Sequence, residues 1–121
     1  MLINLSNHPS EKWGEDQMNA AKELFGEIAD YPFPIVDPNA ATTEIHQIAY
    51  RIYNEILVSN TGGYSIHLMG EFTFCYQFAR ICEENQILCF VSTTKREVEV
   101  KENGEKISKF KFIKFRPYVE T

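Results

Sequence analysis

The chain has 121 residues, of which 44% are hydrophobic and 13% aromatic, and this composition favours one globular domain over a disordered chain. The formal net charge of −5 argues against a protein that binds extended nucleic acid. No stretch approaches the roughly 20 apolar residues of a membrane helix. No secretory signal opens the chain, so we expect a cytoplasmic protein.

The three cysteines, Cys75, Cys82 and Cys89, lie within apolar patterns. An odd number of thiols in such surroundings predicts reduced cysteines that serve as small core residues. The sequence has no CxxC pair, no Cys/His cluster, no Walker loop and no GxGxxG turn. We therefore expect neither a metal site nor a cofactor.

Strands and helices alternate through the first part of the chain. Residues 2–5 predict a short strand, which cannot continue through Pro9. Residues 15–25 predict a helix with apolar side chains on one face and Gly26 as its stop. Residues 28–34, which are bounded by prolines, predict a second short strand.

The same alternation continues in the middle of the chain. Isoleucines at helical spacing predict a helix that ends near residue 58, with Thr42 or Thr43 as its N-cap. Residues 64–69 then predict a third strand and residues 71–84 a third helix.

Residues 86–91 form the most continuous apolar run and predict a fourth strand, buried on both faces as in a parallel sheet. The order of elements is then β-α-β-α-β-α-β. This order is typical of an α/β domain with right-handed crossovers. We expect one three-layer Rossmann-like domain over residues 1–121, with a parallel sheet in the strand order 2-1-3-4.

A C-terminal β-hairpin is predicted over residues 95–118, with a two-residue turn at Asn103-Gly104, at one edge of the sheet. The parity of apolar positions changes between Ile107 and Phe110, so we expect a β-bulge near Ser108-Lys109. Basic residues outnumber acidic ones in this segment. The ordinary interpretation of these residues is a solvated edge hairpin, whose lysines prevent pairing with the edge of another sheet.

Polar residues follow three of the predicted strands at their carboxyl ends. In the expected strand order these ends are neighbours, and ligands of open parallel sheets bind at such an edge. The residues concerned are Asn7 and His8 after the first strand, Gly70 and Glu71 after the third, and Ser92, Thr93, Thr94, Lys95 and Arg96 after the fourth. We expect a ligand site here.

Each of these residues has a physical use in such a site. Gly70 permits close approach, and the helix after it offers N–H donors to an anion. Residues 92–94 supply hydroxyl donors, while Lys95 and Arg96 supply cations suited to phosphate. His8 can act as a general acid or base near neutral pH.

Ordinary structural interpretations stay open for the same residues. Glu71 can be a first-turn acid favoured by the helix dipole, and His8 an ordinary loop residue. Residues 92–94 can be a turn between strand and hairpin. His67 is expected to be a hydrogen-bonded core histidine, and Trp13 a core residue, although its ring could also stack on a base.

Three stretches, INLSNHP, IHLMGEFTF and VSTTKREV, resemble the small stand-alone CRISPR-associated proteins with a Rossmann-like core, akin to CARF domains. The resemblance implies a homodimer that binds a cyclic oligoadenylate second messenger across its two-fold axis. Some such proteins are metal-independent ring nucleases that linearise the messenger. CARF domains usually continue into an effector domain, whereas here a hairpin follows, which favours degradation or simple capture of the ligand.

Carried over by position, the resemblance assigns ligand contacts to Asn7, Gly70, Glu71 and residues 92–94. In a ring nuclease of this kind, a ribose 2′-hydroxyl attacks its own phosphate when held in line. Lys95 and Arg96 would stabilise the transition state, and His8 would protonate the leaving oxygen. Glu71 would orient the ligand by accepting from a ribose hydroxyl, a base amine or Arg96. A non-catalytic sensor or sponge, and a protein-interaction module, are the alternatives.

Overall fold

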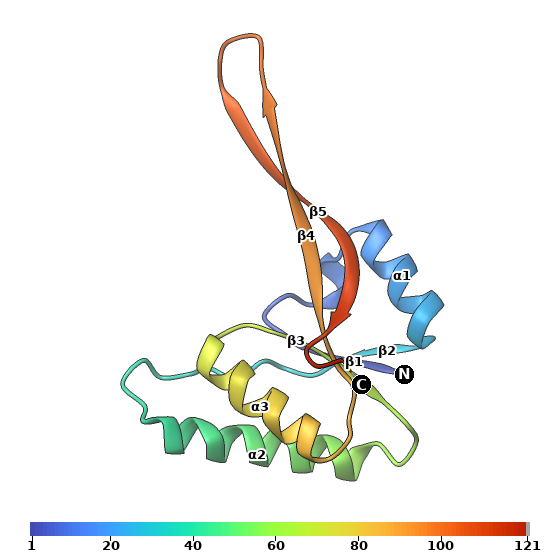
Figure 1. Ribbon diagram of the computed structural model, residues 1–121, viewed down its shortest axis with the longest axis vertical. Coiled ribbons are helices and arrows are strands. Elements are labelled where there is room, and N and C mark those ends of the chain that lie inside the picture. Colours follow the sequence, from blue (N-terminus) through green and yellow to red (C-terminus); the bar gives the residue numbers. More distant parts are fainter. Residues whose placement is uncertain (121) are drawn as a thin grey trace.

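A five-stranded sheet with the order β2-β1-β3-β4-β5 organises the chain (Figure 1). The computed structural model describes residues 1–120. The strands are β1 (Leu2–Ser6), β2 (Ile28–Asp30), β3 (Ser65–Met69), β4 (Cys89–Val100) and β5 (Lys106–Pro117). Strands β2, β1, β3 and β4 pair in parallel, and β5 is antiparallel to β4. The order 2-1-3-4 is confirmed, but the sheet as a whole is mixed.

Helices cover both faces of the sheet (Figure 1). They are the short 3-10 helix η1 (Ser10–Lys12), α1 (Glu15–Phe25), α2 (Thr42–Ser59) and α3 (Phe72–Glu84). Helices α2 and α3 bury their apolar sides in the larger core with Ile3 and Leu5 of β1. On the opposite face, α1 packs with Leu2 and the aromatic residues of the smaller core. All five residues of β1 are buried because helices cover it from both sides.

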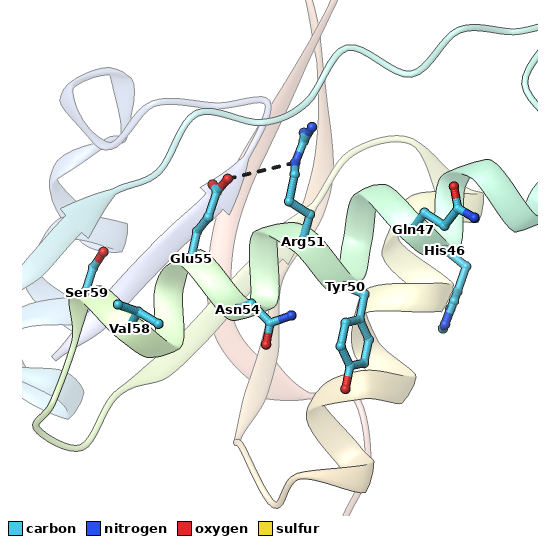
Figure 2. Close-up of a pocket in the computed structure, with 8 residues that line it drawn as sticks. All are labelled: His46, Gln47, Tyr50, Arg51, Asn54, Glu55, Val58 and Ser59. Carbon is cyan, nitrogen blue, oxygen red and sulfur yellow. Dashed lines mark ion pairs between the residues drawn. The ribbon is translucent and has the colours of Figure 1, made fainter.

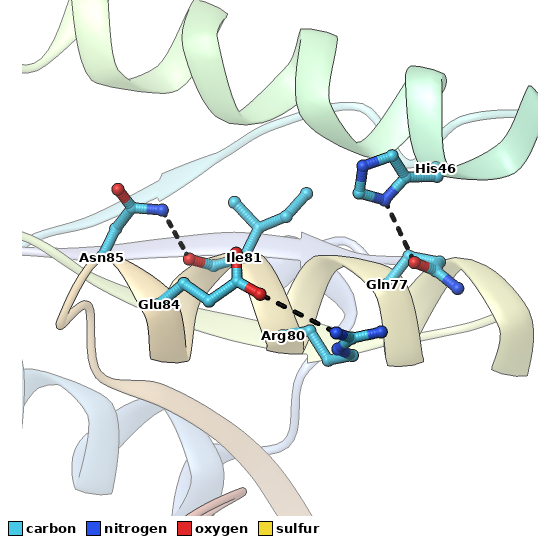
Figure 3. Close-up of polar contacts among 6 residues, drawn as sticks. All are labelled: His46, Gln77, Arg80, Ile81, Glu84 and Asn85. Atoms are coloured by element: carbon cyan, nitrogen blue, oxygen red, sulfur yellow. Dashed lines mark hydrogen bonds and ion pairs between the residues drawn. The ribbon is translucent and has the colours of Figure 1, made fainter. Parts of the chain in front are cut away.

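Polar contacts also occur between α2 and α3 and at the end of α3 (Figure 3). The ring Nδ1 of His46 on α2 lies 3.1 Å from Oε1 of Gln77 on α3. At the end of α3, the amide of Asn85 donates to the carbonyl of Ile81 at 2.7 Å. The first contact joins α2 to α3, and the second satisfies a carbonyl at the end of α3.

The predicted starts and stops of two elements are wrong for local reasons. The N-cap of α2 is Ala41, whose carbonyl accepts from the N–H groups of Glu44 and Ile45, so neither Thr42 nor Thr43 is the cap. Strand β2 ends at Asp30, well before residue 34, in a segment whose prolines at 32 and 34 have no N–H to donate to a ladder.

Strand β4 runs without interruption from the core of the sheet into the hairpin. The sequence predicted a strand over 86–91 and a hairpin over 95–118 at one edge of the sheet. The edge hairpin is confirmed, but the strand begins at Cys89 and is continuous with the hairpin. Strand β3 pairs with β4 only at Cys89 and Phe90. Beyond that point β5 supplies the partner, and the pairing continues from Phe90 to Val100. The result is a two-stranded arm that projects from the body of the protein (Figure 1).

The bulge and the turn of the hairpin differ from the prediction. Thr93 pairs with Lys114 and Thr94 with Phe112, so Ile113 is the extra residue and no bulge occurs near Ser108. At the tip, the N–H of Lys101 donates to the carbonyl of Glu105. This bond closes a three-residue loop over 102–104, one residue longer than expected, in which Gly104 has φ +87°.

The three cysteines lie in the core. Cys75, Cys82 and Cys89 are free thiols buried in the larger core, as predicted. Burial, with a further contribution from Glu71, raises the pKa of Cys75 to about 12, so this thiol stays protonated at neutral pH.

Among residues 1–120, no helix is long and apolar enough to cross a membrane.

Candidate functional site

A cavity of about 710 Å³ lies between the start of α1 and the base of the hairpin arm. Residues from six segments line it: Asn7 and His8 after β1, Lys12 of η1, Gly14 to Gln17 at the start of α1, His67 and Met69 of β3, Ser92 and Thr94 of β4, and Phe110 to Phe112 of β5. Segments far apart in the sequence thus converge on one concave surface, as expected of a ligand site.

A second hollow, of about 900 Å³, lies on the outer side of α2 (Figure 2). All of its lining residues come from that one helix, between His46 and Ser59, and they include the exposed ion pair of Arg51 and Glu55 at 3.9 Å. None of the residues predicted from the sequence lines it. Because no other element contributes, we take the cavity beside α1 as the candidate site.

The cavity gathers four of the nine predicted site residues: Asn7, His8, Ser92 and Thr94. Gly70, Glu71, Thr93, Lys95 and Arg96 do not line it. Alternation along the strand explains why Thr93 and Lys95 lie on the face opposite to Ser92 and Thr94, whereas Arg96 is bonded to Ser108 on the arm. A loop, as predicted, could have turned all of them toward one ligand.

Lys95 and Arg96 lie on the hairpin arm. Lys95 pairs across the ladder with Lys111. The guanidinium of Arg96 donates to the hydroxyl of Ser108, from Nη2 at 2.9 Å and from Nε at 3.2 Å. The two cations assigned to catalysis therefore stand outside the cavity.

Glu71 is the N-cap of α3. Its carboxylate accepts from the backbone N–H groups of Thr73 at 3.1 Å and Phe74 at 2.7 Å. The pKa of Glu71 is lowered mainly by the N–H of Phe74, with burial opposing and the N–H of Thr73 adding to the effect. The donors that the sequence offered to an anion are thus used by the protein's own carboxylate.

We expect Glu71→Ala to lower the free energy of unfolding by about 1 kcal/mol, because two N–H groups of α3 lose their acceptor. Urea unfolding at pH 7 measures this. Glu83→Ala, which removes an exposed carboxylate in the last turn of the same helix, is the control. It should leave the stability unchanged or raise it slightly. Equal effects of the two substitutions would contradict the cap.

Gly70 makes room for a side chain of the protein. A Cβ at this position would lie 2.3 Å from Cζ of Phe33, and the backbone has φ +156°. The ring of Phe33 in turn packs against Phe74, with ring centroids 5.1 Å apart. The close approach that the sequence assigned to a ligand is made by Phe33.

The start of α1 is a site feature that the sequence interpretation missed. Its N-cap is Gly14, and no side chain caps its first N–H groups. Gly14 to Gln17 line the cavity together with Lys12, so helix donors and a cation face the same space. Glu15 and Asp16 place acidic groups on the same rim. Gly14 stands where Ser, Thr, Asp or Asn usually caps a helix. This was the signal in the sequence that the first N–H groups of α1 lack a side-chain acceptor.

His67 lies at the floor of the cavity, where it is only 1% exposed. Its Nδ1 lies 2.8 Å from Oδ1 of Asn4, and its Nε2 lies 3.2 Å from Oγ of Ser92. The prediction of a hydrogen-bonded core histidine is confirmed. Burial, with a smaller contribution from His8, lowers the pKa of His67 to about 4, so the ring is neutral at pH 7.

The backbone carbonyl of His8 organises the segment after β1. It accepts from Nδ2 of Asn4 at 3.0 Å, Oγ of Ser6 at 3.0 Å and Nε1 of Trp13 at 3.1 Å. Trp13 is buried against His67, with ring centroids 5.3 Å apart, which confirms its core position. This anchoring holds the loop while the side chains of Asn7 and His8 stay exposed at the cavity.

Comparison with known families gives one match. The family described as "Uncharacterized protein MJ1673 family" matches residues 1–116. The chain belongs to the MJ1673 family. The matched segment contains every residue that lines the cavity.

No curated protein matches the chain. No solved structure matches it either. Within residues 1–120, no group of three or more His, Cys, Asp or Glu side chains is arranged to hold a metal ion.

Proposed function

We propose that this cytoplasmic member of the MJ1673 family binds a cyclic oligoadenylate in the cavity beside α1, as a Rossmann-like, CARF-like protein of CRISPR antiviral signalling. The observation that carries the proposal is the convergence of Asn7, His8, Ser92 and Thr94 on the uncapped start of α1. All four of these residues fall in the stretches that resemble CARF-type proteins.

The cavity offers a partner for each part of a nucleotide. A phosphate suits the N–H groups at the start of α1 and the ammonium of Lys12. Phe110 lines the cavity and is 69% exposed, so its ring is free to stack on a base. Asn7 and Thr94 supply polar groups for the ribose or for the edge of the base.

The volume of about 710 Å³ suits part of a cyclic oligonucleotide, since pockets for drug-sized ligands measure roughly 300–1,000 Å³. We propose that two copies of the chain share one ring across a two-fold axis. The homodimer rests on the CARF resemblance, in which the messenger lies between two identical subunits.

Capture of the ring, as by a sensor or sponge, is favoured over its cleavage. Lys95 and Arg96, the groups assigned to the transition state, lie outside the cavity. Metal-independent cleavage remains the second candidate because His8 lines the cavity and could protonate a leaving oxygen.

Calorimetric titration of the purified protein with cyclic tetra- and hexa-adenylate, in the presence of EDTA, tests the proposal. We expect binding of at least one ring, a ligand-dependent rise in melting temperature, and no linear product. Lys12→Glu should weaken binding about tenfold or more, because a positive charge that binds the phosphate is replaced by a negative charge that repels it. Lys22→Glu, on α1 but outside the cavity, should bind as the wild type does.

The other outcomes are equally informative. Linear oligoadenylate that accumulates in the wild type and not in His8→Ala would establish cleavage. If neither ring binds or shifts the melting temperature, the nucleotide proposal fails and a protein-interaction module takes its place.

A further inference from the structure

The polar residues under the cavity form one connected chain of hydrogen bonds. It runs from Asp30 through Asn4 and His67 to Ser92, across strands β2, β1, β3 and β4. Asn4 and His67 are each 1% exposed, while Ser92 lines the cavity. Because each buried group must satisfy its neighbour, the donor and the acceptor can be assigned from Asp30 as far as His67.

The direction is set first at Asn4. Its Nδ2 lies 2.7 Å from the carboxylate of Asp30 and 3.0 Å from the carbonyl of His8, and both of these groups can only accept. Burial alone would raise the pKa of Asp30, but hydrogen bonds from Ser10 and Asn4 outweigh it and lower the pKa, so Asp30 is ionised at pH 7. The amide nitrogen of Asn4 must therefore face Asp30, and Oδ1 must face the other way.

The second step fixes the tautomer of His67. Oδ1 of Asn4 can only accept, so Nδ1 of His67, 2.8 Å away, must carry a proton. The buried ring is neutral at pH 7 and has only this one proton. Its other nitrogen, Nε2, is therefore an acceptor directed at Ser92.

The third step concerns the single hydroxyl hydrogen of Ser92. Oγ lies 3.2 Å from Nε2 of His67 and 2.8 Å from the thioether sulfur of Met69. Both neighbours are acceptors, so the hydrogen is used within the protein whichever of them receives it. What Ser92 can still offer to the cavity is its lone pairs.

We infer that Ser92 is a hydrogen-bond acceptor at the floor of the cavity, and that Asp30, Asn4 and His67 are positioning residues that impose this direction. The ligand must then present a hydroxyl or amine at this point, not a phosphate oxygen. This reverses the donor role that the sequence suggested for Ser92. The identity of the ligand rests on the proposed function; in a cyclic oligoadenylate the available donors are the ribose 2′-hydroxyl and the adenine 6-amino group.

NMR of the protein labelled with ¹⁵N-histidine tests the direction without any ligand. We expect His67 at pH 7 to be neutral, with Nδ1 protonated and Nε2 unprotonated. A proton on Nε2, either in the other tautomer or in an imidazolium, would overturn the inference. His67→Phe assigns the signal, since the chain has three histidines.

A binding experiment then tests selection of a donor and separates its two sources. The wild type is titrated with cyclic tetra-adenylate, with its 2′-O-methyl analogue and with cyclic tetra-inosinate, which lacks the 6-amino group. We expect about a tenfold or greater loss of affinity for one of the two analogues. Ser92→Ala should lose this discrimination, whereas Thr93→Ala, outside the cavity, should retain it.

Unchanged discrimination in Ser92→Ala, or equal affinity of the wild type for all three rings, overturns the assignment of Ser92. If the wild type binds none of the rings, the proposed function fails. In that case recognition of the ribose 2′-hydroxyl or the adenine 6-amino group by Ser92 also fails. The tautomer of His67 then decides by itself whether Ser92 is a hydrogen-bond acceptor.

Discussion

Gly70→Ala is expected to lower the free energy of unfolding by about 2–4 kcal/mol, measured by urea unfolding at pH 7. The new Cβ would lie 2.3, 2.6 and 2.8 Å from three ring carbons of Phe33, far inside van der Waals contact. The φ of +156° adds backbone strain, because residues with a Cβ rarely adopt it. Phe33 cannot move away freely, since its ring is packed on Phe74.

The matched control is Gly62→Ala, where an added Cβ meets nothing within 4 Å. It should change the stability by less than about 0.5 kcal/mol, as surface substitutions do. A double-mutant cycle isolates the cause: on a Phe33→Ala background, the cost of Gly70→Ala should fall to the strain term alone. A cost that is the same on both backgrounds would show that Phe33 is not the reason for the glycine.

Acidification is expected to destabilise the protein through His67. The pKa of this histidine falls from 6.5 in an unfolded chain to about 4 in the folded protein, because the buried ring resists protonation. Between these two values the unfolded chain binds a proton that the folded protein does not. Stability contributed by the neutral ring is therefore complete above about pH 6.5 and is lost progressively toward pH 4. The total is on the order of 3 kcal/mol.

Urea unfolding between pH 7.5 and pH 4 gives the free energy of unfolding at each pH. The effect of His67 is the difference between the wild type and His67→Phe in the slope of this free energy against pH. The variant, which has no proton to gain here, should lose less stability over this range even if it is less stable at every pH. His46→Phe, at an exposed position on α2, should keep the wild-type slope. Parallel curves for the wild type and His67→Phe would rule out His67 as the group responsible. Carboxylates such as Glu71 titrate in both proteins and cancel in the difference.

Local patterns were sufficient for much of the fold. The spacing of Ile45, Ile52 and Ile56 predicted α2, and all three face the core. The apolar residues Leu2, Ile3 and Leu5 predicted the strand β1, which the structure confirms and buries on both sides. The alternation of strands and helices then limited the parallel part of the sheet to few orders, of which 2-1-3-4 is the one found.

The candidate site was predicted only in part, and strand β4 shows why. Asn7 and His8 were correctly placed beside the ends of neighbouring strands because they follow a clear strand and a proline limits its length. Residues 92–96 have the polarity of a loop, and they are a strand only because β5 supplies backbone partners from residues 106–117. The predicted hairpin over 95–118 indicated part of this pairing, but no local signal showed that it reaches back to Phe90.

The amino-acid sequence by itself determined the helices, the approximate position of most strands and much of the core, because hydrophobic periodicity and proline positions act within a few residues. The tertiary structure alone decided what the polar groups do. Glu71 caps a helix, Phe33 occupies the space beside Gly70, and Ser92 lies within hydrogen-bond distance of His67 and Met69. Each outcome depends on which acceptor or ring arrives from another element, and only folding brings these groups together.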